Sequence, residues 1–160
     1  MSDTVKLRYE IEYANQMDSA DNPNEIDARY NLVKIGVNVN AWDFDGAYEV
    51  LGAGDGRVTT PLATLHAHNG WADRFLSTPA EGLVDIFVSA GWGKNGWAAK
   101  AVYHDFSSDE MSIDFGTELD LMVTKKLPCG ATVGLKGALY SADAHSSDTE
   151  KFWFWVAKSF

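Results

Sequence analysis

Apolar and polar residues alternate along most of this chain. The first segment sets the pattern, with Val5, Leu7 and Tyr9 at one parity and Lys6 and Arg8 at the other. A period of two residues is typical of a β-strand with one apolar face. The same pattern recurs and predicts eight strands, over residues 5–13, 30–40, 44–50, 84–92, 97–104, 115–124, 132–139 and 151–160.

The links between the predicted strands alternate in length. Those after the first, third, fifth and seventh strands are about 10 to 30 residues long, and those after the second, fourth and sixth are about 3 to 5, as in hairpins. Short turns at one end and long loops at the other are typical of outer-membrane barrels. We therefore predict an all-β fold, an antiparallel up-and-down transmembrane β-barrel of eight strands, as one domain over residues 1–160.

Aromatic residues indicate which face of the predicted strands meets lipid. Near the short-turn ends they are Phe44, Trp92, Trp97 and Phe160, and near the long-loop ends they are Tyr13, Tyr30, Tyr103, Phe106, Phe115 and Phe152. The residues between them are mainly Val, Leu, Ile and Ala. Two aromatic girdles around an aliphatic belt match the two interfaces of a bilayer.

The polar parity is then expected to line a lumen. It mixes both signs of charge, at Lys6, Arg8, Glu10, Glu12, Glu49, Lys100, Glu118, Asp120 and Lys136. A Lys or Arg turned toward lipid at mid-membrane costs about 2–4 kcal/mol, whereas a wet lumen leaves it hydrated or paired. The alternative is a small closed or soluble β-barrel that binds an apolar ligand and has no channel activity.

Composition restricts the partners. The chain has 23 acidic and 13 basic residues, and its net charge of −10 would repel nucleic acid. No apolar run approaches the roughly 18 residues of a transmembrane helix. The single Cys129 excludes a disulfide framework within one chain. The opening residues, MSDTVKLRYE, lack a basic segment followed by an apolar one, so the sequence as given shows no signal peptide.

Several segments resemble a known family. They are residues 61–83 (PLATLHAHNGWADRFLSTPAEGL), 102–110 (VYHDFSSDE), 116–121 (GTELDL) and 148–160 (DTEKFWFWVAKSF). Together they are similar to the C-terminal region of the alginate-export-type family of bacterial outer-membrane porins, whose members are larger barrels. The resemblance implies that this chain is the C-terminal portion of such a barrel in a Gram-negative outer membrane. Its partners would then be membrane lipid, lipopolysaccharide and the barrel-assembly machinery.

The end of the chain carries a further resemblance. Phe160, with apolar residues at alternate positions before it, resembles the C-terminal signature that outer-membrane proteins present to the barrel-assembly machinery, although Lys158 departs from it. Eight strands enclose an interior filled by side chains, and an aqueous channel needs about 16. We therefore expect passive diffusion of small solutes through the complete barrel. The balanced lumen charges do not favour a polyanion such as alginate.

The long link over residues 52–83 is too long to be idle in a compact domain. Its Leu62, Leu65, Trp71 and Phe75 indicate that part of it is packed. We expect this link to fold over or into the barrel mouth.

Candidate chemistry is sparse. His66 and His68 with Asp73 are too few for a metal site, because no further spaced His or Cys joins them. His104 and Asp105, with Ser107 or Ser108 close by, are the residue types of a nucleophile and its general base. Nothing in the sequence fixes their geometry. We predict no enzyme activity, no cofactor and no metal.

Overall fold

In a computed structural model, the chain folds into ten β-strands, described over residues 5–20, 23, 25–60 and 68–159. The strands are β1 (Val5–Met17), β2 (Asp27–Val39), β3 (Trp42–Leu51), β4 (Ala53–Gly54), β5 (Gly56–Arg57), β6 (Leu83–Lys94), β7 (Trp97–Ser107), β8 (Asp114–Lys126), β9 (Thr132–Ala142) and β10 (Thr149–Ala157). The described residues form no helix. Among them, therefore, no helix is long and apolar enough to cross a membrane.

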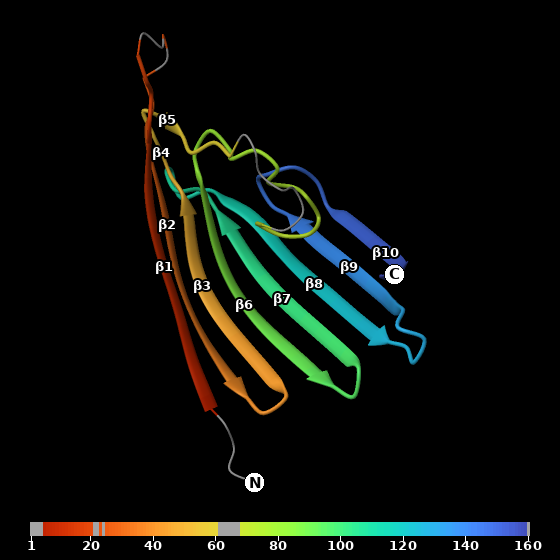
Figure 1. The fold of residues 1–160 in the computed structure, drawn as a ribbon. Helices are drawn as coiled ribbons and strands as arrows, with labels where there is room; N and C mark the ends of the chain where they lie inside the picture. Colours follow the sequence, from red (N-terminus) through yellow and green to blue (C-terminus); the bar gives the residue numbers. More distant parts are fainter. Residues whose placement is uncertain (1–4, 21–22, 24, 61–67, 160) are drawn as a thin grey trace.

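Eight of these strands form one antiparallel up-and-down sheet (Figure 1). Its order is β1-β2-β3-β6-β7-β8-β9-β10, so each strand pairs with its neighbour along the chain, apart from the small β4-β5 ribbon between β3 and β6. The eight predicted strands are confirmed, and several are longer than the alternation alone indicated.

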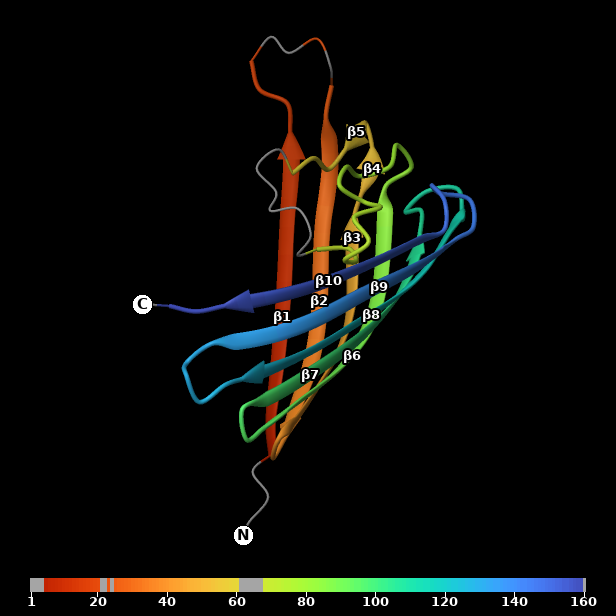
Figure 2. The ribbon, with the colours of Figure 1, turned by 90° about the vertical axis from the view of Figure 1, so that its right-hand side faces the viewer.

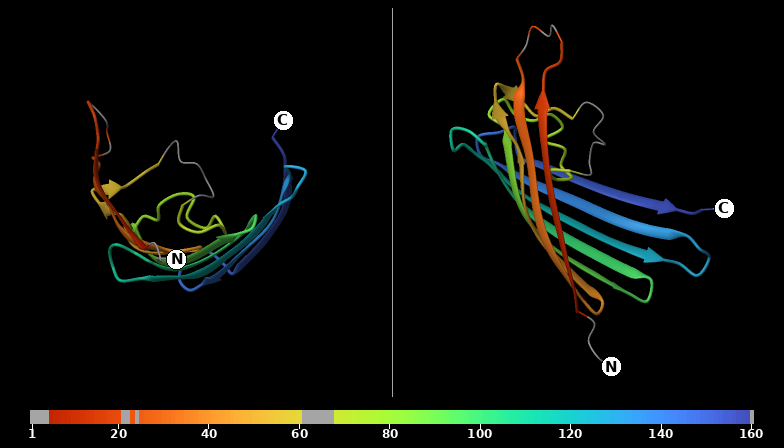
Figure 3. Two further views of the ribbon diagram at one scale, coloured as in Figure 1. Left: turned by 60° about the horizontal axis from the view of Figure 1, so that its bottom comes forward. Right: turned by 60° about the vertical axis from the view of Figure 1, so that its left-hand side comes forward.

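The sheet is open, and the predicted closure into a barrel is not present. Strands β1 and β10 are the two edges of the sheet and pair with no described strand on their outer sides. Figure 3 shows the sheet curving through an arc that leaves these edges apart. Figure 2 shows the strand direction turning strongly from β1 to β10. Alternation fixes the order of neighbouring strands, but closure depends on twist and curvature, which are properties of the whole sheet.

The sheet has a turn end and a loop end. At the turn end the links are Asn40 and Ala41, Asn95 and Gly96, and residues 127–131. Asn95 and Gly96 both adopt positive φ, 53° and 76°, as a tight two-residue hairpin turn requires. At the loop end the links are residues 18–26, 52–82, 108–113 and 143–148. The last two have only six residues, fewer than predicted, because the flanking strands extend into them.

The two faces of the sheet differ sharply. One parity forms an outer face of apolar residues with no described layer over it, where for example Tyr9 is 80% exposed and Leu7 is 74% exposed. The other parity forms an inner face, on the concave side, that carries the charged residues. The buried core lies at the loop end of the inner face, between the strands and the folded part of the 52–82 link.

Candidate functional site

All nine residues predicted to line a lumen lie on the inner face. The pairing register places them together there: Lys6, Arg8, Glu10, Glu12, Glu49, Lys100, Glu118, Asp120 and Lys136. Their distribution is uneven, because Glu118 and Asp120 are fully buried whereas Glu10 and Glu12 are exposed.

Residues 69–75, here called the strap, cross the inner face at its loop end. The side-chain amide of Asn69 donates to Glu49 Oε2 at 3.0 Å and to Asp85 Oδ2 at 3.3 Å. The backbone N–H of Trp71 donates to Asp120 Oδ2 at 3.1 Å, and that of Ala72 donates to Glu118 Oε1 at 2.7 Å. Hydrogen bonds to carboxylates are stronger than neutral ones, so the acidic side chains of β3, β6 and β8 hold the strap.

The far side of the strap is attached to β9, β10 and the link between them. Asp73 forms an ion pair with Lys151 at 2.8 Å, and Arg74 Nε donates to Ser146 Oγ at 2.8 Å. The ammonium group of Lys136 lies 4.8 Å from the ring centre of Trp71 and 4.5 Å from that of Trp153. These cation–π contacts join the strap to β9 and β10.

The strap ends in a buried aromatic cluster. The Phe75 ring centre lies 4.4 Å from that of Phe106, 6.0 Å from that of Phe115 and 4.8 Å from that of His145. Phe75 therefore fixes the end of the strap by burial. The described part of the 52–83 link therefore folds onto the inner face at the loop end, and the barrel mouth that was predicted there is absent because the sheet is open.

His104 belongs to a buried polar pair beneath the strap. Its Nδ1 atom lies 2.9 Å and 3.0 Å from the two carboxylate oxygens of Asp85, and its Nε2 atom lies 3.8 Å from Asp120 Oδ2. Its ring stacks on Phe106 with centres 5.2 Å apart. Asp105 points to the outer face, because consecutive strand residues face opposite sides. The structure therefore does not bring His104 and Asp105 together.

No metal centre emerges from the described residues. Among them, no group of three or more His, Cys, Asp or Glu side chains is placed to hold an ion. His66 lies outside the described residues, His68 is exposed, and Asp73 is paired with Lys151.

A second polar cluster lies on β1 to β3. Arg8 Nη2 lies 2.6 Å from Asp43 Oδ2 and 2.8 Å from Asp45 Oδ1, and its other amino group bonds Asn38. Gly36 makes room for this arrangement, because a Cβ atom there would collide with Asp45 Oδ1 and the guanidinium group of Arg8. The alternation of residues places Arg8 on the polar parity but does not identify these partners, which lie 30 or more residues away.

We expect Gly36→Ala to destabilise the fold by no more than about 1 kcal/mol, because the added methyl group displaces the ends of the Arg8 and Asp45 side chains, which are flexible and partly exposed, and weakens their ion pair. Gly46→Ala is the matched control, since Gly46 lies on the outer face of the adjoining strand and has nothing within 4 Å of its Cβ position. Urea unfolding of both variants in detergent measures the difference. Equal stabilities would show that the space over Gly36 is not needed.

The aromatic residues predicted to form two girdles are divided between the two faces of the sheet. Tyr13, Phe44, Trp92, Trp97, Tyr103 and Phe152 lie on the outer face, as predicted. Tyr30, Phe106 and Phe115 lie on the inner side instead. Tyr30 donates to Glu49 Oε1 at 2.8 Å, whereas Phe106 and Phe115 are buried against the strap. Phe160 lies outside the described residues.

Phe115 changes face because the ladder between β7 and β8 is irregular. The register shifts between Phe106 and Ser107, and Gly116 adopts a φ of 119° beside Phe115. An irregularity of this kind redirects the side chains that follow it, so the parity of β8 does not extend to Phe115. Tyr30 has a simpler cause, because it already stands at the polar parity of β2, opposite Ala14.

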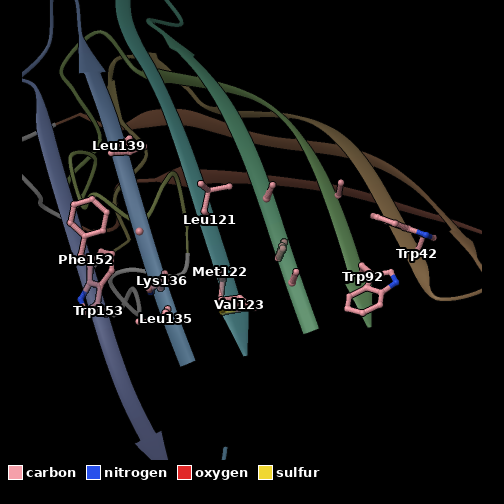
Figure 4. A pocket seen from close by; sticks show the side chains of 15 residues that line it. Trp42, Trp92, Leu121, Met122, Val123, Leu135, Lys136, Leu139, Phe152 and Trp153 are labelled. Atoms are coloured by element: carbon pink, nitrogen blue, oxygen red, sulfur yellow. The ribbon is translucent and has the colours of Figure 1, made fainter. Parts of the chain in front are cut away.

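Trp42 is an outer aromatic residue that sequence analysis missed, since it fell in a predicted turn. It begins β3 and pairs with Trp92, and its ring stacks on Phe44 with centres 6.0 Å apart. Trp42 lies two residues before Phe44 and so shares its parity, which is the signal in the sequence that predicts an outer position for Trp42. Trp42 and Trp92 border a shallow hollow of about 600 Å³ on the outer face, which Figure 4 shows with Leu121, Leu139 and Phe152 around it.

Comparison with known proteins identifies no relative. No protein-family model, no curated protein and no solved structure matches this chain.

Proposed function

We propose that this chain forms wall strands of an outer-membrane β-barrel of porin type, through which small solutes diffuse passively in the complete barrel. The observation that carries the proposal is the outer face, an apolar surface across all eight strands with no described layer over it. Soluble proteins rarely expose a continuous apolar surface of this extent, whereas a barrel wall needs one toward lipid.

The dimensions of the outer face support contact with lipid. On β1 the apolar residues run from Val5 to Tyr13, close to the roughly 9–11 residues with which a tilted strand crosses a bilayer. Charged residues of the outer parity occur only near its borders. Lys94 and Lys125 lie at the turn end. At the loop end lie Asp27, Arg29, Asp105, Asp114 and Glu150. This is the distribution that a hydrocarbon layer between two interfaces selects.

The open edges support a larger barrel. Unpaired strand edges expose backbone N–H and C=O groups, which cannot remain unpaired in lipid. Pairing of β1 and β10 with further strands would satisfy them. An aqueous channel needs about 16 strands, so the eight described here would form part of its wall. The strap would narrow the lumen near the loop end.

The resemblance to the alginate-export-type porins agrees with this proposal and would make the chain the C-terminal portion of such a barrel. Its setting would be the outer membrane of a Gram-negative bacterium, its partners lipid, lipopolysaccharide and the assembly machinery, and its cargo a small solute. A soluble barrel that binds an apolar ligand needs its apolar parity inside. On this sheet that parity faces outward, away from the concave side.

Tryptophan fluorescence in vesicles with brominated acyl chains tests the proposal. Trp42, Trp92 and Trp97 lie on the outer face, whereas Trp153 and Trp155 lie on the inner face and Trp71 lies in the strap. Bromine quenches only indoles in contact with lipid. We expect strong quenching in a variant that keeps the three outer tryptophans, with Phe at the other three positions.

The reciprocal variant, with Phe at the three outer positions, is the control and should show little quenching. Vesicles of unbrominated lipid give the reference intensity for both. Equal quenching in the two variants, or none in either, would contradict a lipid-facing outer surface.

A further inference from the structure

The charges of the inner face change sign along the strands. The strand register aligns the inner residues into rows that cross the sheet, and the rows follow one another along the strands from the turn end to the loop end. The first of four successive rows, in the turn-end half of the sheet, contains three cations and one carboxylate, at Lys6, Asp43, Lys100 and Lys136. The second row is balanced, with Arg8, Asp45, Asp120 and Lys151.

The third and fourth rows, toward the loop end, are acidic. The third contains Glu10, Lys34 and Glu118, beside His104. The fourth contains Glu12, Glu49 and Asp85, with no Lys or Arg among its described residues. The net charge of Lys, Arg, Asp and Glu therefore falls from row to row, from basic at the turn end to acidic at the loop end.

The strap does not neutralise the acidic half. It offers Glu49 and Asp85, in the fourth row, only the neutral side-chain amide of Asn69. Charges that change sign along a channel wall produce an electric field along the channel. The low-dielectric walls strengthen this field by focusing it.

We propose that the inner face sorts charged solute groups along the strand direction, attracting cationic groups at the loop end and anionic groups at the turn end. The solute class that fits both ends is a small zwitterion, with its ammonium group toward the loop end. Passage of such a solute rests on the proposed porin function, whereas the field itself is a property of the folded chain.

Paired cysteine probes test the field directly. Leu32 stands between Glu12 and Glu49, and Met122 stands between Lys100 and Lys136, both half-buried on the inner face. Each would be replaced by Cys in a Cys129→Ser background. The reagents are methanethiosulfonates of similar size, one with a trimethylammonium group and one with a sulfonate.

We expect the ratio of cationic to anionic reagent rates to be about tenfold or more higher at Leu32→Cys than at Met122→Cys in low salt. Both reagents react with the same thiolate at each site, so the ionisation and accessibility of that thiol cancel in the ratio of the two rates. The ratio therefore reports the local electric potential. Adding Glu12→Gln to Leu32→Cys should lower the ratio, and molar salt should bring the two sites together. Equal ratios in low salt would overturn the proposal.

A second pair of cysteine probes tests the same field if either of the first two variants fails to fold. Ala14→Cys and Thr124→Cys are small substitutions on the inner face, the first at the loop end and the second at the turn end. They should show the same order of ratios, and the opposite order would contradict charge sorting.

Vesicle swelling then tests the solute class. Vesicles that contain the complete barrel, in which further strands pair with β1 and β10, should swell faster in glycine betaine, a zwitterion, than in a neutral solute of similar size. Equal swelling in both solutes would contradict selection by charge. Absence of swelling in either would contradict the porin function, while the reagent ratios, which need no pore, still decide whether the field exists.

Discussion

Val88→Arg is expected to prevent most of the chain from folding into lipid vesicles. Val88 is 57% exposed at the middle of β6 on the outer face, where the proposed function places hydrocarbon. An arginine at the midplane costs about 2–4 kcal/mol, a large fraction of the net stability of a domain. Electrophoresis without boiling, on which folded and unfolded β-sheet membrane proteins migrate differently, measures the folded fraction.

Leu32→Arg is the matched control on the inner face. It also replaces an aliphatic side chain with arginine, but it places the new charge between Glu12 and Glu49. We expect it to fold as well as the unchanged chain. If Val88→Arg folded equally well, the outer face would be in contact with water, and the membrane proposal would fail.

Phe75→Ala should release the strap from the inner face. The ring is 8% exposed and packs against Phe106, Phe115 and His145. Removing a buried phenylalanine side chain typically costs about 3–5 kcal/mol, from lost transfer free energy and the cavity left behind. Hydrogen exchange should then show loss of protection at Trp71 and Ala72, whose N–H groups donate to Asp120 and Glu118 in the folded chain.

Leu76→Ala is the control for this substitution, because Leu76 follows directly in the chain and is 47% exposed. It should leave exchange at the strap and the unfolding midpoint nearly unchanged. Unchanged protection in Phe75→Ala would show that the polar contacts alone hold the strap, and that the aromatic cluster is incidental to it.

Local signals predicted the strands well. The Asn95–Gly96 hairpin and the alternation in β1 and β6 each depend on a few neighbouring residues, and the structure has them at the predicted places. The division of the inner-face residues from the apolar residues also followed from parity, because side chains of a strand alternate between two faces. The exceptions among the aromatic residues were Tyr30 and Phe106, which stand at the inner parity, and Phe115, where the ladder shifts.

Long-range partners were not predictable in the same way. Arg8 with Asp43, Asn69 with Glu49 and Asp73 with Lys151 join segments far apart in the chain. The hydrophobic pattern does not say which carboxylate stands beside which cation, since several registers satisfy it equally. The strap in particular has no periodicity, and its path depends on hydrogen bonds to four acidic side chains.

The sequence by itself determined that this protein forms eight antiparallel strands, each with one apolar and one polar face. Both features depend on neighbouring residues alone, through the two-residue period of a strand and the short turns between strands. Only the tertiary structure decided that the sheet remains open, that the strap crosses its inner face, and that the inner charges fall in order from basic to acidic. Those features depend on the curvature and register of the whole sheet, which place residues from different strands side by side.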